Sequence, residues 1–450
     1  MNKKTIMTMC IASIIPITLT NAQNGVNSPY SRYAFGVLAD RSMGFNKGMA
    51  GVAQGMRGGQ IINPANPASY SAVDSLSALF DMGLTLQNGN YKMENVQQNA
   101  RNTSLDYMAF HFRALKQVGV AMGILPFSKI NYNITSETEH VGGTDNVTSS
   151  YTFTGEGGIH QAYIGVGWQA TRWLSVGMNG SYLFGNYSHT TNMTFSESSV
   201  YSIARGYTSD ITTWMTDFGL QYIQPLGMDR TLTLGFTYGL GHDINNKAVR
   251  STQTINTSAY TTEGITSDTI HNAFQLPHTF SVGLAYKQGT RLTVGADFEL
   301  QQWSKCKFPT QENNSGSYVS TKGQFNDKIR ISAGAAYTPD ARSPKLLKHS
   351  TYKMGGFYGQ LYANTDVTGQ LNSKAHEFGL TAGISIPISN RFIWYNNPRL
   401  NVSVQWTNCN IPYLSNTGNA ISKHNLKENY LKLSIGLTFN ERWFHKFKME

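Results

Sequence analysis

Residues 75–87 read SLSALFDMGLTLQ, and apolar and polar side chains alternate along this stretch. One face is apolar and consists of Leu76, Ala78, Phe80, Met82, Leu84 and Leu86. The other face carries Ser77, Asp81, Gly83, Thr85 and Gln87, with Leu79 as the exception. Because successive side chains of a β-strand point to opposite faces, this alternation predicts a strand with one face suited to lipid and the other to a polar lumen.

The same alternation recurs over most of the chain. Clear runs occupy residues 231–240, 279–286, 292–300, 329–337, 377–388, 400–407 and 431–439. A soluble β-sandwich shows similar alternation, but many of these runs reach the ~10 residues that a tilted membrane strand needs. Together the runs predict an all-β fold, a transmembrane antiparallel β-barrel.

The connections between the runs alternate in length, as in outer-membrane barrels with short periplasmic turns and long external loops. Short connections are expected at 114–117, 170–172, 226–230, 287–290 and 390–398. Long polar loops are expected at 88–103, 128–149, 190–209, 243–272, 309–324 and 408–429. This arrangement predicts about fourteen strands, with both chain ends on the periplasmic side.

The composition fits a barrel in the bacterial outer membrane. Charged residues make up only 14% of the chain, against ~25% in a typical soluble domain. The apolar residues are too interrupted for membrane-spanning helices. The net charge of +10 is dispersed, so we expect it to contact anionic membrane lipids and lipopolysaccharide, and we expect no nucleic acid as partner.

The two ends of the chain suggest further segments. Lys3 and Lys4, an apolar stretch and the small residues before Gln23 indicate a signal peptide at 1–22. Residues 23–73 are rich in Gly, Asn and Ala and lack the strand pattern, so we interpret them as a plug inside the barrel; a flexible periplasmic leader is the alternative. The barrel is expected over 74–440, and an aromatic and basic periplasmic tail over 441–450.

Motifs that would indicate catalysis are weak. Residues 165–170 fit the dinucleotide fingerprint, but they lie inside an alternating strand rather than between a strand and a helix. The eleven histidines show no ligand spacing, so we predict no catalytic residue, no metal and no cofactor, and hence no enzyme. Cys306 and Cys409 are more consistent with free thiols than with a disulfide, and six of the tryptophans (Trp173, Trp214, Trp303, Trp394, Trp406 and Trp443) are predicted near strand ends at the membrane boundary.

Charged residues on the inward faces suggest a lumen network. Asp297 and Glu299 point inward on one predicted strand, and Lys328 and Arg330 point inward on the next. Charges in a narrow lumen are expected to pair. Two interpretations remain open: a salt-bridge network that holds the barrel shape, or a cation at Lys328 or Arg330 offered to a carboxylate ligand.

Three stretches resemble the FadL-like transporters of the outer membrane. These are the Gly- and Ala-rich start with Asn63-Pro64-Ala65, the run 276–283 (LPHTFSVG) followed by Trp303-Ser304, and the run 328–334 (KIRISAG). The resemblance implies a fourteen-stranded barrel with an N-terminal hatch and passive uptake of hydrophobic compounds such as long-chain fatty acids. It implies roles for Asn63, Pro64 and Ala65 in the hatch, for Leu276, Pro277, Trp303 and Ser304 near the wall and rim, and for Arg330 in the lumen; with Lys328 these are the candidate ligand-binding or gating residues.

Two functions therefore remain open. The first is a channel for passive uptake of a hydrophobic small molecule. The second is a barrel that does not transport and instead serves as a subunit of a larger secretion or barrel-assembly complex with other outer-membrane proteins. The predicted function is the channel; the polar external loops, rich in Ser and Thr at 191–209 and 249–267, show no apolar capture groove and fit the alternative.

Overall fold

The computed structural model describes residues 26–442 except 95, 137–138, 141–146, 198, 245, 257, 260, 312–317, 365–373, 389–397 and 418–419. The predicted signal peptide and most of the predicted tail, with Trp394 and Trp443, lie outside the described residues. Fourteen strands form the barrel wall: β2 (Ser77–Met93), β3 (Val96–Leu115), β4 (Val118–Thr135), β6 (Thr148–Gln169), β7 (Leu174–Phe195), β8 (Ser202–Pro225), β9 (Arg230–Gly239), β14 (Thr279–Gln288), β15 (Leu292–Gln301), β18 (Lys328–Tyr337), β19 (Thr351–Gln360), β20 (His376–Pro387), β21 (Arg399–Thr417) and β22 (Ala420–Arg442).

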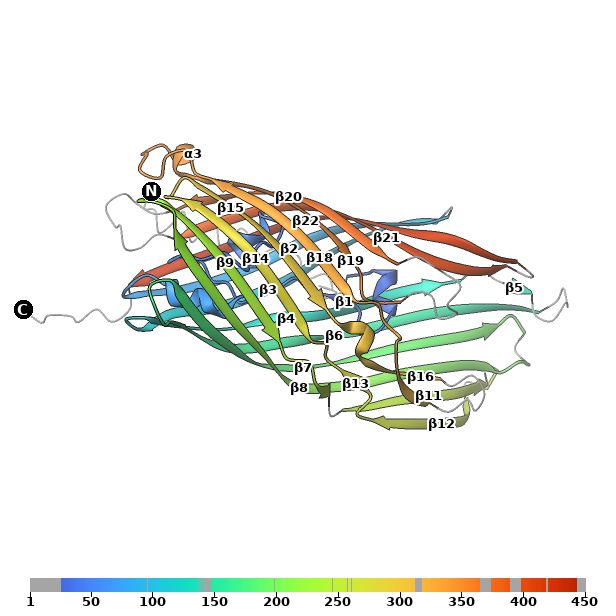
Figure 1. Cartoon of the computed structure of the whole chain (residues 1–450). Coiled ribbons are helices and arrows are strands. Elements are labelled where there is room, and N and C mark those ends of the chain that lie inside the picture. The colour runs from blue at the N-terminus through green and yellow to red at the C-terminus, as the bar shows by residue number, and fades with distance from the viewer. Residues whose placement is uncertain are drawn as a thin grey trace, which may run out of the picture.

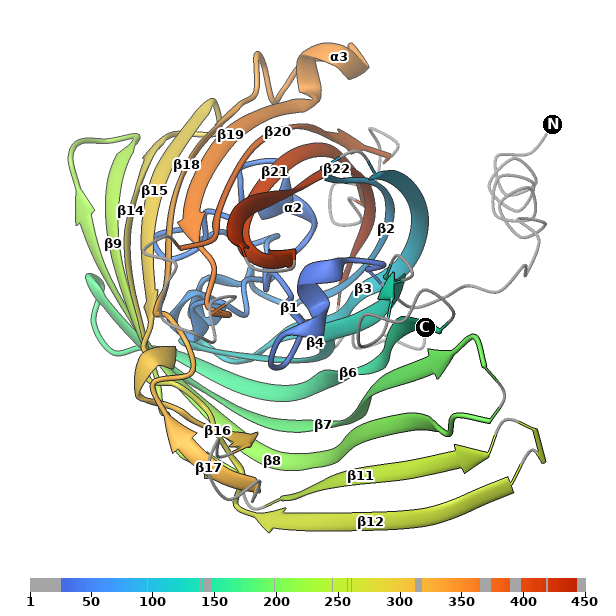
Figure 2. The same ribbon diagram turned by 90° about the vertical axis from the view of Figure 1, so that its right-hand side faces the viewer.

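Each wall strand pairs antiparallel with the next, and β2 pairs with β22 to close the barrel (Figures 1 and 2). In that closing ladder Ser77 lies opposite Arg442, so the first and last wall strands begin and end at the same rim. The prediction of a closed fourteen-stranded antiparallel barrel is confirmed.

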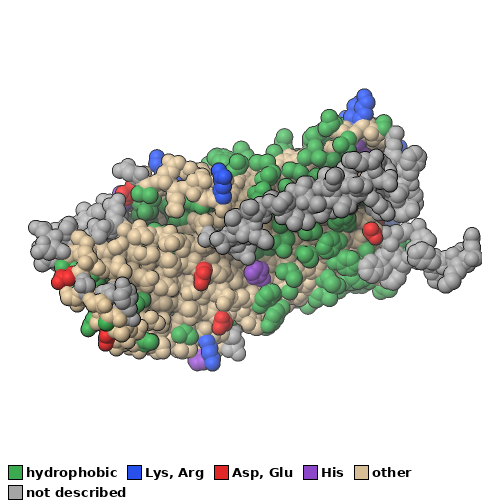
Figure 3. Space-filling model, turned by 180° about the vertical axis from the view of Figure 1, so that it is seen from behind, with side chains coloured by type: hydrophobic (Ala, Val, Ile, Leu, Met, Phe, Trp, Pro, Cys, Tyr) green, Lys and Arg blue, Asp and Glu red, His purple; other side chains and the backbone are tan. Residues whose placement is uncertain are grey.

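The alternation that predicted the wall is visible in side-chain burial. Leu84 and Leu86 of β2 are exposed on the outside, whereas Asp81 and Thr85 are buried on the inside. Leu79, the exception in the pattern, is fully buried against the chain that fills the lumen. Hydrophobic side chains gather over the half of the surface nearer the rim with α3 (Leu346–His349), and the opposite half is mostly polar (Figure 3). This band suits a bilayer.

The predicted long loops at 88–103, 190–209 and 408–429 are wrong as loops, because paired strands run through most of them. β8 has 24 residues and β22 has 23, well beyond the ~10 that cross a membrane. Polar Thr, Ser and Asn side chains hide this continuation from a search for apolar alternation, whereas the backbone ladder needs no apolar face. The wall therefore continues beyond the apolar band.

Residues 26–73, the described part of the predicted plug, lie inside the ring of strands (Figure 2) and are here called the inner segment. It contains η1 (Pro29–Arg32), β1 (Val37–Leu38), α2 (Gly44–Lys47) and η2 (Pro67–Ala72). The remaining short elements are β5 (Glu139–His140), β10 (Asp243–Ile244), β11 (Lys247–Asn256), β12 (Thr261–His271), β13 (Phe274–Gln275), η3 (Trp303–Lys305), β16 (Lys307–Gln311) and β17 (Tyr318–Lys322). Among the described residues, every helix is too short or too polar to cross a membrane.

Glycines on the inner face of the wall explain how the inner segment fits. A Cβ atom on Gly235 of β9 would lie 1.9 Å from the backbone oxygen of Gln54, and one on Gly177 of β7 would lie 2.4 Å from the carbonyl carbon of Pro67. Both distances are far inside van der Waals contact. The wall thus lacks side chains where the backbone of the inner segment lies against it.

Candidate functional site

The site is the junction between the inner segment and the wall, and it includes a gap between β3 and β4. β3 pairs with β2 along nearly its whole length, but it pairs with β4 only from Met108 to Leu115. Beyond that point β4 pairs instead with β1 of the inner segment, where Leu38 lies opposite Ser128. A piece of the inner segment therefore takes the place of a wall strand.

Two local features divert the wall strands at this gap. In β3 the register against β2 shifts at Gly83, so that Asp106 is an extra, bulged residue between Leu105 and Tyr107. In β4 the register against β6 shifts after Pro126, which has no backbone N–H to donate to a ladder. Bulges and prolines are typical places where strand pairing ends.

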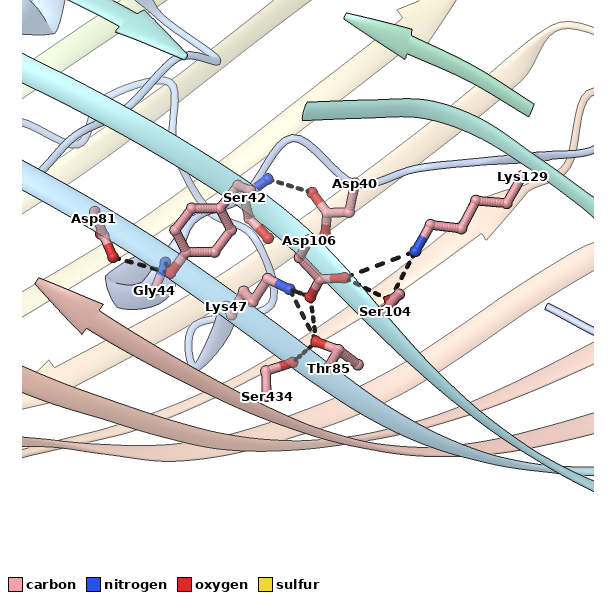
Figure 4. Close-up of polar contacts among 11 residues, drawn as sticks. Asp40, Ser42, Gly44, Lys47, Asp81, Thr85, Ser104, Asp106, Lys129 and Ser434 are labelled. Carbon is pink, nitrogen blue, oxygen red and sulfur yellow. Dashed lines mark hydrogen bonds and ion pairs between the residues drawn. The ribbon is translucent and has the colours of Figure 1, made fainter. Parts of the chain in front are cut away.

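The bulged Asp106 links three parts of the molecule (Figure 4). It forms ion pairs with Lys47 of α2 and, at 3.8 Å, with Lys129 of β4, so it connects β3 both to the inner segment and across the gap. Ser104 supports the cluster by donating to Asp106 Oδ1 at 3.0 Å and accepting from Lys129 Nζ at 2.9 Å. Thr85 of β2 also donates to this carboxylate.

A second set of charges holds the inner segment to the opposite wall. Arg330 of β18 lies 3.5 Å from Asp40 and donates to the backbone oxygen of Ala50 at 3.3 Å. Arg41 pairs with Asp217 of β8 at 3.1 Å. Burial would raise the pKa of the Asp40 carboxyl, but Arg330 and the Ser42 N–H outweigh it and hold that pKa below its usual value. Arg330 therefore already has a carboxylate partner supplied by the chain itself.

The start of the inner segment is fastened by Glu428 of β22. This fully buried carboxylate accepts hydrogen bonds from Ser28 Oγ at 2.9 Å, from the backbone N–H of Tyr30 at 3.2 Å and from the Tyr430 hydroxyl. Several donors on one buried carboxylate satisfy the charge without water. The N-terminal end of the inner segment is thus bound to the last wall strand.

An aromatic cluster surrounds Phe35, which comes just before β1 in the chain. The Phe35 ring is fully buried, with ring centroids of Phe274 at 5.2 Å, Trp303 at 5.6 Å and Phe308 at 6.0 Å. Its neighbours Ala34 and Gly36 have φ values of +57° and +80°. The left-handed conformation is unfavourable for alanine by roughly 1–2 kcal/mol. The aromatic contacts around Phe35 hold the backbone in this turn.

Two cavities of the described residues border the inner segment and the charged groups above. The larger, about 160 Å³, is bordered by β3, β4 and the inner segment, and its lining includes nine charged side chains: Asp40, Lys47, Asp106, Lys129, Lys328, Arg330, Glu377, Glu428 and Lys432. The rest of the larger cavity's lining is largely apolar, with Val37, Leu38 and Phe357 among it, and the smaller cavity, about 80 Å³, lies between Asp40, Asp217 and Asp297. Both are small beside the ~300–1,000 Å³ of typical small-molecule sites.

The residues predicted from the resemblance fall into separate places. Asn63 is buried inside the inner segment, where its side-chain amide donates to the backbone oxygen of Ala53 at 2.7 Å. Pro64 accepts from the Asn179 side chain at 2.9 Å, and Ala65 borders the smaller cavity. These contacts fix Asn63 and Pro64 in place. The role of these three residues in gating remains a prediction.

The positions predicted near the wall and rim do not form one site with the lumen cations. Leu276 and Pro277 border a cavity of about 20 Å³, and the backbone N–H of Ser304 donates to Asp327. Trp303 was expected at the membrane boundary, but its ring is fully buried in the aromatic cluster. The chain turns inward after β15, so the aromatic ring at this strand end packs against protein and not lipid.

The predicted charge pairing in the lumen is found in part. Lys328 pairs with Glu299 on the neighbouring strand at 3.8 Å. Arg330 pairs with Asp40 instead, and Asp297 accepts from the backbone N–H groups of Ala53 and Gln54 at 2.5 and 2.9 Å. These contacts favour the structural interpretation of the inward charges. Cys306 and Cys409 are free and buried, as expected, and the described residues contain no cluster of His, Cys, Asp and Glu suited to a metal.

Sequence reasoning missed Phe35, Asp40, Lys47 and Asp106. The first three lie in a stretch without periodic pattern, where one sequence offers no signal for the partner of a side chain. Asp106 lies next to a predicted loop, and its position between Leu105 and Tyr107 reads as an ordinary inward residue of a strand.

Solved structures confirm the class of fold. The chain is similar to the P. putida toluene transporter TodX, with 14% identity over 90% of this chain and 100% of that one and a TM-score of 0.58. It is also similar to a Pseudomonas aeruginosa FadL homologue (12% identity, 91% and 100% coverage, TM-score 0.57) and to the Ralstonia pickettii toluene transporter TbuX (13%, 90% and 99%, 0.53). The fold, with its fourteen strands and internal N-terminal segment, is that of the FadL-like outer-membrane barrels.

The family is narrower than this fold class. The family model described as BamG matches residues 1–450, the whole of the sequence, so the chain belongs to the BamG family. A comparison with curated proteins found no match. The three solved structures above are transporters or a transporter homologue by name, and at 12–14% identity they inform us about the fold and not about the ligand.

Proposed function

We propose that this chain is a plugged outer-membrane barrel that acts as a structural subunit of a larger outer-membrane complex. The observation that carries the proposal is the occupied lumen. The inner segment fills it, and Phe35 occupies the aromatic cluster in which a hydrophobic ligand would otherwise be expected. We place both chain ends on the periplasmic side, in line with the shared rim of β2 and β22.

The charged lining of the remaining cavity supports the same function. A long hydrophobic molecule that entered it would have to desolvate ion pairs such as Lys47–Asp106 and Asp40–Arg330, which carries a large free-energy penalty. The cavity of about 160 Å³ is also small for such a molecule. Both facts favour a fixed barrel over a fatty-acid channel.

The second candidate function is passive uptake of a hydrophobic small molecule, and the gap between β3 and β4 favours it. Among the described contacts, β1, the Asp106–Lys129 ion pair and the hydrogen bond from Lys129 to Ser104 bridge the wall there. A shift of the inner segment would open a sideways path between the lumen and the bilayer. In this case the inner segment is a movable hatch and the predicted uptake function holds.

Gentle detergent extraction of the native protein, followed by mass spectrometry of co-purifying lipids and proteins, separates the two functions. We expect stoichiometric partner proteins and no stoichiometric hydrophobic ligand. A fatty acid or hydrocarbon present at one molecule per barrel, with the barrel otherwise alone, would overturn the structural proposal and support uptake. Extraction at low and high salt serves as a control, because charge-driven contaminants are lost at high salt.

A further inference from the structure

The hairpin of β11 and β12 ends in a strand edge without a partner. β11 pairs on one side with the first residues of β8, from Ser202 to Asp210, and on the other side with β12. In the ladders of the described residues, β12 has no strand on its second edge, although β17 comes close to it. β12 is the outermost strand of this part of the molecule (Figure 2).

The free edge lacks the lysines and prolines that commonly protect edges. Such edges are commonly blunted by lysines, prolines or bulges. β12 contains no Lys, Arg or Pro, and six of its eleven residues are Thr or Ile, which favour strands. The one irregularity in the β11–β12 ladder lies near the tip, so Gly264–His271 pair in regular register. Ten of the eleven side chains of β12 are exposed.

The base of the hairpin is firmly held, which distinguishes this edge from a flexible loop. Ala248 of β11 and Phe274 of β13 are fully buried, and Phe274 contacts Phe35 in the aromatic cluster. Asn246 donates to Ser209 of β8 at 2.8 Å. A strand presented in a fixed position loses little conformational entropy on pairing, so the edge is preorganised for a partner.

We infer that the free edge of β12 binds an extended, basic segment of another outer-membrane or cell-surface protein by adding that segment to the sheet. Backbone hydrogen bonds supply the affinity in this mode of recognition, and side chains supply the specificity. Glu263 and Asp268 are the charged groups of β12 apart from His271, so a segment with Lys or Arg matches the edge. A second copy of the same strand carries the same two carboxylates and no Lys or Arg, so it lacks the complementary charge.

This inference rests on the proposed role as a subunit and identifies where a partner binds. The test places a photo-crosslinking amino acid at Thr266 in the chain expressed in its native membrane, with Met228, a fully exposed turn residue at the other rim, as the control site. We expect crosslinks from position 266, and not from 228, to one segment of a different protein that contains Lys or Arg, as identified by mass spectrometry.

Proline substitutions then test whether the contact uses the strand edge. Adjacent amides of a strand point to opposite edges, so T266P and S267P each remove an N–H from a different edge. With the crosslinker moved to Thr269, one of the two variants should lose at least tenfold in crosslinking while the barrel stays folded. D268K should weaken crosslinking more than its neutral counterpart D268N.

The outcomes are distinguishable from those of the proposed function. Crosslinks to a second copy of the chain, to lipopolysaccharide alone, or crosslinks indifferent to both prolines would overturn the edge-binding inference. If partner proteins co-purify while β12 yields no crosslink to them, the subunit role stands and the inference fails. If a hydrophobic ligand co-purifies and no partner does, both fail.

Discussion

The two ends of the inner segment are held in different ways. From Met43 onward its backbone lies against wall glycines, and buried side chains such as Met49 and Tyr70 fill the space between them. From Val26 to Ser42 it is held by charged groups, by hydrogen bonds and by the buried rings of Tyr30 and Phe35, with Asp40 and Phe35 as the main contacts. The part from Met43 onward is fixed mainly by shape, with the Lys47–Asp106 ion pair as its separable contact at the gap, and the part from Val26 to Ser42 is held by a few separable interactions.

The difference indicates which part of the inner segment is able to move. Backbone packed on glycine has no second arrangement without rebuilding the wall. Ion pairs and individual buried rings can exchange their contacts for water or for a ligand. A movable hatch would therefore involve the N-terminal part, and a permanent plug would keep both parts in place.

The largest loss of folded protein is expected where the inner segment packs directly on a wall glycine. In G235A the new Cβ atom would meet the Gln54 backbone oxygen at 1.9 Å, and neither backbone is free to retreat. We expect most of the folded barrel to be lost, a larger effect than the ~1–3 kcal/mol of ordinary overpacking. The folded fraction after refolding into lipid vesicles, measured on unheated gels, checks this.

The matched control is G180A on β7, where the new Cβ atom meets only one atom, at 4.0 Å. Alanine in a strand is ordinarily favoured over glycine by roughly 0.5–1 kcal/mol, so this variant should fold at least as well as the original. Normal folding of G235A would contradict the packing of the inner segment against the wall.

The aromatic cluster provides the next test, because Phe35 contributes packing without a charge. F35A removes a fully buried ring, which typically lowers the free energy of unfolding by about 3–5 kcal/mol. The barrel should still form, because the wall ladders are untouched. Urea unfolding in vesicles measures the shift, and unchanged stability would mean that the aromatic cluster does not hold Phe35.

The same variant separates the two candidate functions. If the barrel takes up hydrophobic molecules, F35A enlarges an apolar space on their path and should bind a fluorescent fatty acid more tightly than the original does. If the barrel is a fixed subunit, the space is walled by Trp303 and Phe274 and should admit at most a small apolar molecule. Leucine at position 35 is the control, since it keeps most of the packing.

The wall strands were predictable from the sequence because the pattern that predicts them, alternation of apolar and polar residues, is local. Alternation within each run, as at Leu84 and Thr85, reveals which side faces lipid without knowledge of any neighbour. The inner segment was predictable only as a region, from its composition and the absence of that alternation. Its contacts were not predictable, because Asp40 meets Arg330 across 290 positions of sequence.

The errors have equally physical causes. The parts of β8 and β22 beyond the apolar band were assigned to loops, because a strand outside the bilayer needs no apolar face. Trp303 was assigned to the membrane boundary because an aromatic residue at a strand end suits either lipid or a buried cluster. Its direction depends on the inward turn of η3, for which the sequence offers no sign.

The smallest loss of stability is expected for a substitution of Asp106. This substitution is also the most informative about movement of the inner segment. D106N keeps the shape of the cluster but leaves Lys47 and Lys129 without their carboxylate. The groups are partly solvated, so we expect a loss of about 1–2 kcal/mol rather than the ~3–5 kcal/mol of a fully buried pair. Because ~1.4 kcal/mol is a factor of ten in population, the inner segment should leave the gap roughly ten times more often.

A cysteine at Leu38 of β1, in a chain whose Cys306 and Cys409 are replaced by serine, reports this motion through its rate of thiol labelling. The control is E299Q, which disrupts an ion pair within the wall and should leave the labelling rate unchanged. A tenfold faster rate in D106N alone would locate the movable part at the gap. Equal rates in both variants would mean that β1 is held by its ladder with β4 and not by charge, which is what a permanent plug requires.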